Sequence, residues 1–242
     1  MLYIFLMRIT KYYSPNFDLK VRSNKRITSI IIHYTGMQSE RESLKKLSST
    51  VKKVSCHYLI GRNGKIFNLV KDKNIAWHAG KSRWGKYKNL NANSIGIELT
   101  NKGHRYGYQN FTKIQIKQLV KLCKKLKRKY RIKNNLILGH SDIAPLRKID
   151  PGEKFPWSLL SNNGLGIYPK NTAKNKKKIK NISNKDFFNN LYKIGYRYLK
   201  VKFKKKITKN FQRRYRQSNI DGVLDFETLE ISSFLAKKSN IT

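Results

Sequence analysis

The stretch Asn135-Leu-Ile-Leu-Gly-His140-Ser-Asp-Ile-Ala-Pro-Leu-Arg-Lys148-Ile-Asp150-Pro-Gly decides how this chain is organised. Its apolar run at residues 136–138 predicts a short buried strand that delivers His140 at its end. The loop that follows contains a proline and brings Lys148 and Asp150 back within ten residues of His140. An imidazole and a carboxylate at this spacing can reach one metal ion, provided that a further ligand comes from elsewhere in the chain.

A second apolar strand, Ile30-Ile31-Ile32-His33, also ends in a histidine. Its unbroken run of isoleucines is typical of a strand covered on both faces, as in the middle of an α/β sheet. Together His33, His140 and Asp150 would leave the fourth position of a tetrahedral Zn²⁺ open to water. Such an open position is typical of a catalytic zinc site rather than a structural one.

A third strand is predicted over residues 94–99, where apolar side chains alternate with small or polar ones. On this pattern Glu98 shares one face with Ser94 and Gly96, while the apolar side chains take the other face. A carboxylate in such a strand is costly to bury unless it is paired or takes part in chemistry. Glu98 is therefore a candidate catalytic group, with one half of a buried ion pair as the alternative.

The segment Trp77-His78-Ala79-Gly80 follows in the region before this strand, with Trp84 close behind it. Two tryptophans, a histidine and a glycine within a few residues are typical of a loop that forms a pocket wall. A lone histidine is more often a satisfied polar residue than a metal ligand. His57 and His78 are therefore kept only as pocket-wall candidates or as partners of a ligand.

The pattern as a whole predicts an α/β fold, with a mixed sheet flanked by helices and a small helical unit behind it. A hairpin is expected around residues 61–64, where Asn-Gly supplies positive φ. The longest helix is expected over residues 112–130, which carry an apolar stripe at helical spacing. The predicted divisions are a lead-in segment at 1–26, the main domain at 27–170, a basic linker at 171–184 and a three-helix domain at 185–242.

The charge of the chain is extreme, because 54 basic and 13 acidic side chains give a formal net charge of +41. Such a charge can indicate a polyanionic partner, but here it is spread along the chain and no nucleic-acid-binding motif accompanies it. Lys, Asn and Ile share A/T-rich codons, so we favour a compositional bias and expect no nucleic-acid partner. Cys56 and Cys123 make no disulfide framework. No run approaches the roughly 20 apolar residues of a membrane-spanning helix.

Several motifs match one known family over consecutive residues. They are His33-Tyr-Thr, Ser55-Cys-His57-Tyr-Leu-Ile, Trp77-His-Ala-Gly, Ser94-Ile-Gly-Ile-Glu98-Leu and the stretch from Gly139 to Gly152. In this order, from about residue 27 to residue 169, the chain resembles the zinc-dependent N-acetylmuramoyl-L-alanine amidases of the amidase-2 family. The tail, with Asn210-Phe-Gln-Arg-Arg and Asp221-Gly-Val-Leu-Asp, is similar to the three-helix peptidoglycan-binding domain.

The resemblance implies a role for each residue of the candidate site. One Zn²⁺ per chain would be held by His33, His140 and Asp150. Glu98 would be the general base that takes a proton from the attacking water and returns it to the leaving amine. Lys148 would stabilise the tetrahedral oxyanion.

The same resemblance implies a substrate and a location. The substrate would be peptidoglycan or its muropeptides, contacted by Trp77, His78 and Ala79. The bond cleaved would join N-acetylmuramic acid to L-alanine, and the enzyme is expected to be a monomer in the bacterial cell envelope. Two-domain members of the envelope type typically carry a lipid-attachment cysteine, which does not follow the apolar start here, so the cytoplasm is the alternative location. The alternative function is non-catalytic peptidoglycan binding, and the retention of all three ligands together with Glu98 argues against it.

Overall fold

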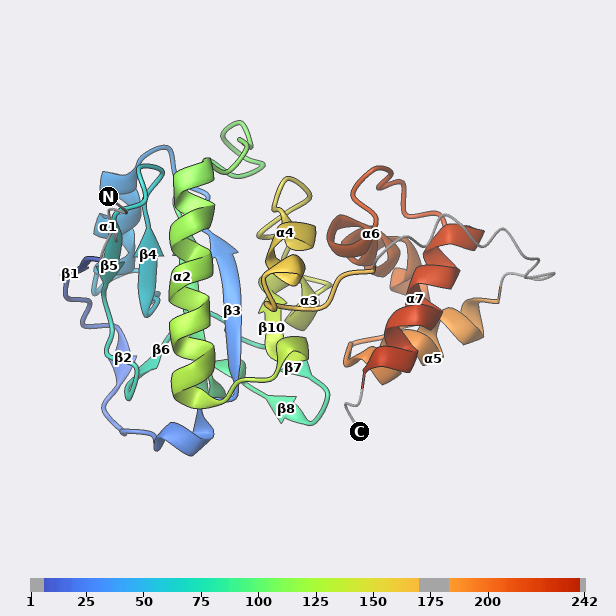
Figure 1. The fold of residues 1–242 in the computed structure, drawn as a ribbon, viewed down its shortest axis with the longest axis horizontal. Coiled ribbons are helices and arrows are strands. Elements are labelled where there is room, and N and C mark those ends of the chain that lie inside the picture. The colour runs from blue at the N-terminus through green and yellow to red at the C-terminus, as the bar shows by residue number, and fades with distance from the viewer. Residues whose placement is uncertain (1–6, 170–182, 240–242) are drawn as a thin grey trace, which may run out of the picture.

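The computed structural model describes residues 7–169 and 183–239, and its main unit is built on a six-stranded sheet (Figure 1). The strands, in their order across the sheet, are β1 (Ile9–Lys11), β5 (Ile66–Asn68), β4 (Tyr58–Ile60), β9 (Ser94–Leu99), β3 (Ser29–Tyr34) and β10 (Ile137–Gly139). Neighbouring strands are parallel except β4 and β5, which form the predicted hairpin. The predicted mixed sheet is therefore confirmed.

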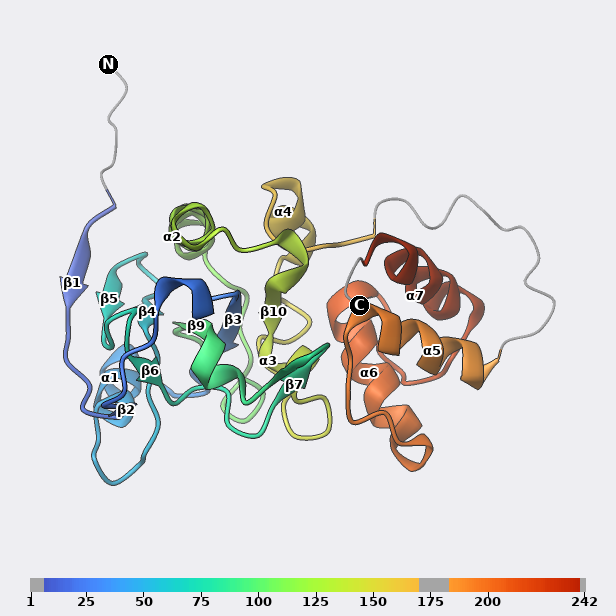
Figure 2. The ribbon, with the colours of Figure 1, turned by 90° about the horizontal axis from the view of Figure 1, so that it is seen from below.

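Helices cover both faces of this sheet. Figure 2 shows α2 (Lys113–Tyr130) on one face and α1 (Glu40–Leu47) on the other. Because both faces are covered, residues 30–32 of β3 are fully buried, as their unbroken apolar run predicts. Helix α2 begins after Thr112, whose side chain accepts a hydrogen bond from the amide of Gln115.

Shorter elements surround this core. Two small antiparallel ribbons pair β2 (Phe17–Asp18) with β6 (Ile75–Ala76), and β7 (Arg83–Trp84) with β8 (Tyr87–Lys88). Two short helices, α3 (His140–Ile143) and α4 (Trp157–Asn162), follow β10. The chain thus passes directly from the last strand of the sheet into α3, and His140 is the first residue of that helix.

Part of the predicted lead-in segment belongs to the sheet. Strand β1 pairs in parallel with β5, with Ile9 opposite Ile66, and forms the edge of the sheet. The boundary placed at residue 26 therefore divides elements that pack together. A strand of three residues carries too little alternation for its sequence pattern to reveal it.

The C-terminal unit consists of three helices, α5 (Asn184–Ile194), α6 (Lys204–Tyr215) and α7 (Phe226–Lys238). The side chains of Ser183 and Asp225 accept backbone hydrogen bonds at the starts of α5 and α7. Most of the predicted linker, residues 171–182, lies outside the described residues. Its last two residues, Ser183 and Asn184, are the N-cap and the first residue of α5.

The C-terminal unit packs against the main unit beside β7 and α3 (Figure 1). The buried rings of Trp84 and Tyr196 meet edge to face there, with centroids 4.8 Å apart. One apolar cluster continues from the sheet through this contact to Phe211 and Leu235. Across the described residues, no helix combines the length and apolar character that a membrane crossing requires.

Candidate active site

The sheet brings the site residues together because β3 lies between β9 and β10. In the parallel register His33 of β3 is opposite Glu98 of β9, and Ile32 is opposite Gly139, the residue before His140. The carboxyl ends of parallel strands meet at one edge of a sheet, which is where α/β folds place their ligands. Three groups predicted from separate strands therefore share this edge.

Two imidazoles and one carboxylate converge at that edge. The Nδ1 atoms of His33 and His140 lie 2.9 Å apart, and each lies 3.1 Å from Oδ2 of Asp150. All three side chains are buried, and their potential ligand atoms lie within 4.8 Å of one another. The structure thus brings together the three residues predicted as metal ligands.

A chain of hydrogen bonds decides which nitrogen of His33 carries the proton. The Ser94 hydroxyl donates to the carbonyl of Leu90 at 2.5 Å, so its oxygen accepts from Nε2 of His78 at 3.2 Å. Nδ1 of His78 then accepts from Nε2 of His33 at 3.1 Å. Nδ1 of His33 is left without a hydrogen and points at His140 and Asp150.

His140 is oriented in the same way by a backbone carbonyl. Its Nε2 donates to the carbonyl oxygen of Ala79 at 3.1 Å, and Arg147 donates to the same oxygen at 2.7 Å. Nδ1 of His140 therefore also presents a lone pair to the site. A metal-binding histidine typically has its other ring nitrogen fixed in this manner.

The centre of the cluster thus holds three acceptor atoms, from His33, His140 and Asp150, with no hydrogen between them. Burial and then the neighbouring His140 lower the pKa of His33 to about 4, so this imidazole is neutral at neutral pH. Lone pairs at this separation repel unless a cation lies among them, so the residues present fit a metal ion.

Glu98 lies next to this cluster and is buried. Its Oε2 has no hydrogen-bond partner among the described residues. Burial and then the negative charge of Asp150 raise the pKa of Glu98 to about 8. A carboxyl group with a raised pKa and a free oxygen beside a metal site is suited to proton transfer.

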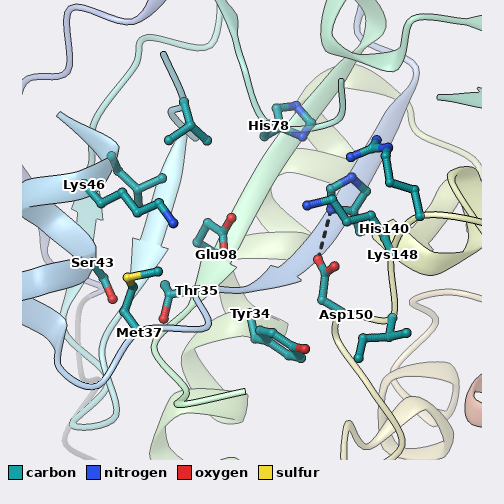
Figure 3. Close-up of a pocket in the computed structure, with 14 residues that line it drawn as sticks. Tyr34, Thr35, Met37, Ser43, Lys46, His78, Glu98, His140, Lys148 and Asp150 are labelled. Carbon is teal, nitrogen blue, oxygen red and sulfur yellow. Dashed lines mark hydrogen bonds and ion pairs between the residues drawn. The ribbon is translucent and has the colours of Figure 1, made fainter. Parts of the chain in front are cut away.

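These groups line a pocket of about 270 Å³. Figure 3 shows Glu98 near its middle, with His140, Lys148 and Asp150 on one side and Lys46, Ser43 and Met37 on the other. Lys148 therefore lies on the same side of the pocket as His140 and Asp150, and its role in catalysis stays a prediction.

Lys46, Met37 and Tyr34 also line the pocket, and the sequence did not single them out. Lys46 lies on α1, and its positive charge is among the influences that lower the pKa of Glu98. As one of 54 basic residues, it had no signal in the sequence that could distinguish it.

The structure separates the three predicted substrate-binding residues. His78 lines the pocket and is hydrogen-bonded to His33, while Ala79 is fully buried and supports His140 through its carbonyl. Trp77 does not line the pocket, and its indole donates to the carboxylate of Asp18 at 2.6 Å. The expectation that Trp77 forms the pocket wall is therefore wrong for this pocket.

His78 can occupy its place because Gly96 has no side chain. A Cβ atom at residue 96 would overlap the ring of His78, which packs across β9 at this point. His57 lies behind His78, with ring centroids 5.7 Å apart, and its Nδ1 accepts from the amide of Gly96. Alternate residues of this face therefore have separate roles: Ser94 anchors His78, Gly96 makes room for it and Glu98 supplies the carboxyl group.

Single-metal hydrolases use this arrangement: two imidazoles and one carboxylate, with a free carboxyl group beside them, at the ends of parallel strands. The model of the N-acetylmuramoyl-L-alanine amidase family matches residues 23–153, which include every one of these groups. The chain belongs to this family, and the predicted family is confirmed.

Two curated relatives resemble this sequence. Over 156 residues it is 42% identical to the N-acetylmuramoyl-L-alanine amidase AmiD of Escherichia coli. The alignment covers 60% of this chain and 55% of AmiD. It is 35% identical to the 1,6-anhydro-N-acetylmuramyl-L-alanine amidase AmpD of Haemophilus influenzae, over 60% of this chain and 85% of AmpD. The match thus spans little more than half the length of AmiD and most of AmpD.

Solved structures are similar over more of the chain. The complex of E. coli AmiD with anhydro-N-acetylmuramic acid-L-Ala-D-gamma-Glu-L-Lys superposes with a TM-score of 0.80 at 32% identity, over 90% of this chain and 91% of that one. The AmpDh3 structure from Pseudomonas aeruginosa in complex with an anhydromuramic pentapeptide gives 0.81 at 30% identity, over 93% and 96%. The similarity therefore extends beyond the family model to the C-terminal helices.

Proposed function

We propose that this protein is a zinc amidase that hydrolyses the bond between N-acetylmuramic acid and L-alanine in peptidoglycan or in muropeptides released from it. The observation that carries the proposal is the convergence of three lone pairs, from His33, His140 and Asp150, beside the free carboxyl oxygen of Glu98. The AmiD and AmpDh3 complexes, whose ligands contain anhydromuramic acid joined to peptide, support the choice of substrate.

His33, His140 and Asp150 would hold the ion. A zinc ion held there would supply a Lewis acid that activates water at neutral pH and favours the ionised form of Glu98. Glu98 then accepts a proton from the water as its oxygen bonds to the carbonyl carbon. Lys148 stabilises the negative charge that develops on the carbonyl oxygen. Glu98 returns the proton to the nitrogen as the C–N bond breaks, which leaves a carboxylic acid on the sugar and a free amine on L-alanine.

We propose that the protein acts in the cell envelope and that its C-terminal helices form a peptidoglycan-binding-like domain. Their similarity to the two-domain members supports both assignments, since the AmiD structure covers 90% of this chain whereas an AmpD structure covers 65%. The division at residues 170 and 185 stays a prediction.

The test is to incubate zinc-loaded protein with purified sacculi and, separately, with a soluble muropeptide, and to identify released peptides by mass. We expect peptides that begin with a free L-alanine amine. Protein that binds zinc and sacculi but releases no peptide would instead be the non-catalytic binding protein.

A further inference from the structure

Three of the five candidate site residues lie on one irregular segment, residues 140–150, which we term the ligand loop. It carries His140, Lys148 and Asp150, and only its first four residues are helical. Few backbone hydrogen bonds join its own residues. The one between residues farthest apart in sequence runs from the amide of Ser141 to the carbonyl of Asp150, at 2.9 Å. A loop of this kind needs support from outside to hold catalytic groups within the narrow tolerance that catalysis requires.

That support comes from the C-terminal helices. The amide of Asn210, on α6, donates to the carbonyl of Pro145 and, at 3.1 Å, to the carbonyl of Lys148 itself. Asn210 is buried, and its own oxygen accepts from Arg213 at 2.8 Å. The side-chain amide thus ties the ligand loop to α6 at two points, and Asn210 itself does not line the pocket.

The start of the ligand loop is tied down by a second set of contacts. Asp142 is completely buried, and it accepts hydrogen bonds from Arg214 of α6 at 2.6 Å and from the Tyr196 hydroxyl at 2.9 Å. It also accepts from the amide of Gly139 at 2.7 Å, and Arg214 reaches the carbonyl of Ile137 at 3.2 Å. The guanidinium lies over the ring of Trp157, 3.7 Å from its centroid.

Every member of such a buried network must have its hydrogen-bond partner, because an unpaired buried charge is strongly destabilising. A buried carboxylate and a buried guanidinium are strongly unfavourable apart, and they are tolerated here because each satisfies the other with good geometry. Buried pairs of this type are weak evidence for stability, but they restrict the chain to one arrangement. The arrangement restricted here is the junction of β10 with the ligand loop, directly before His140.

We propose that the C-terminal helical unit is part of the catalytic machinery, with Asn210 and Arg214 as positioning residues that hold the ligand loop in its productive geometry. This inference rests on the proposed function. Asn210 and Arg214 of the Asn210-Phe-Gln-Arg-Arg motif bind the ligand loop, and Arg213 forms an ion pair with Glu153 of the main unit. Gln212, between them, binds the turn at Asp221 and Val223 within its own unit. The motif therefore joins the two units as well as building the helical one.

The test compares isosteric substitutions in the full zinc-loaded chain. Asn210→Asp keeps the shape of the side chain and an acceptor for Arg213, but it removes the N–H groups that hold the ligand loop. We expect kcat on a soluble muropeptide to fall about 10- to 100-fold, as small misplacements of catalytic groups do, with KM and zinc content close to the parent values. Asn189→Asp, the same change at an exposed position of α5, should leave all three unchanged.

A double-mutant cycle separates positioning from a general effect on folding. If Asn210 acts by placing Lys148, Asn210→Asp should have little further effect on kcat in a Lys148→Ala background. An equal loss in both backgrounds, or a loss that merely follows the fraction of folded protein, would overturn the inference.

Tyr196→Phe provides a milder second variant, because it removes one hydroxyl from Asp142 at the other end of the ligand loop. If Asn210→Asp fails to fold, a parental kcat in both Tyr196→Phe and Arg214→Lys overturns the inference. A parent chain that binds zinc but hydrolyses no muropeptide refutes the proposed function instead. An active parent with a fully active Asn210→Asp variant refutes only the positioning role.

Discussion

The two halves of the site are positioned by different means. His33 and Glu98, the strand half, lie opposite each other on neighbouring strands, where the backbone hydrogen bonds of the sheet fix their separation. His140, Lys148 and Asp150, the loop half, lie on the ligand loop, which is held by residues from a distant part of the sequence. Asn210 binds its backbone, and Tyr196 and Arg214 bind the side chain of Asp142. The comparison teaches that one catalytic centre can combine positions fixed by local pairing with positions that depend on a second structural unit.

The largest effect is expected from removing the ligand that the loop half contributes through Asp150. Asp150→Ala deletes the carboxylate oxygen shared by both imidazoles, so zinc occupancy and amide hydrolysis should be lost together. Metal content measured by mass spectrometry, alongside peptide release, checks this. Asp186→Ala, at an exposed position, is the control. Full zinc content in the Asp150 variant would remove Asp150 from the ligand set.

In the strand half, Glu98→Gln should separate metal binding from chemistry. The amide keeps the shape of the side chain but cannot accept the proton, so turnover should fall by about 10²–10⁴-fold while zinc and sacculus binding remain. Parallel measurements of zinc content, sacculus binding and muropeptide hydrolysis test this. Hydrolysis at the parental rate with zinc bound would show that Glu98 is not the base.

Lys148→Ala probes the chemical contribution of the loop half without removing a ligand. Loss of its charge from the developing oxyanion should lower kcat by about 10²–10³-fold, with zinc content unchanged. Steady-state kinetics on a soluble muropeptide measure the change. Lys81→Ala, at an exposed position on a neighbouring loop, should behave as the parent does. A change confined to KM would assign Lys148 to substrate binding alone.

Ser94→Ala tests the hydrogen-bond chain that orients the strand half. Without the hydroxyl, Nε2 of His78 loses its acceptor, and the proton on Nε2 of His33 is no longer enforced. Loss of such support to a ligand typically lowers metal affinity by about 10- to 100-fold. Competition with a chelator measures the affinity, and saturating zinc should restore most of the activity. Unchanged affinity would mean that the tautomer of His33 is set by its metal alone.

The last prediction concerns stability rather than activity, at His57, which lies behind His78. Burial and the charge of Arg22 lower the pKa of His57 from 6.5 to about 3. Between those values the unfolded chain binds a proton that the folded protein excludes, so the free energy of unfolding falls as pH falls through this range. The slope from this one residue is about 1.4 kcal/mol per pH unit. Urea denaturation of zinc-free protein between pH 7 and pH 4 should show a shallower slope for His57→Asn. An identical slope would mean that His57 takes up its proton in the folded state.

The strand half could be predicted from the sequence, because strand periodicity is a local property. Alternation over residues 94–99 placed Glu98 on the face opposite the isoleucines, and the apolar run before His33 predicted a central strand. The hairpin and the three C-terminal helices also have local signals in turn residues and helical spacing. The spacing of His140 and Asp150 indicated two of the loop residues, whereas the role of Lys148 came from the resemblance to the amidase family.

The support of the loop half could not be predicted in this way. Tyr196 and Arg214 meet Asp142 across 54 and 72 residues of sequence, and no periodic pattern encodes a single hydrogen bond at such a separation. The position of Lys46, which lines the pocket from α1, could not be predicted for the same reason. Trp77 was misplaced because its loop has no regular alternation that would tell which neighbouring side chain faces inward.

The face of β9 that carries Ser94, Gly96 and Glu98 has a consequence for how this chain tolerates change in length. Side chains alternate strictly along a strand, so an inserted residue that shifts the register of β9 by one would exchange the two faces. The proton acceptor, the clearance for His78 and the anchor of its ring would then be replaced together by three bulky apolar groups. A substitution removes one of these three functions, whereas such an insertion removes all of them. We therefore expect the spacing within this strand to be under stronger constraint than any one residue in it.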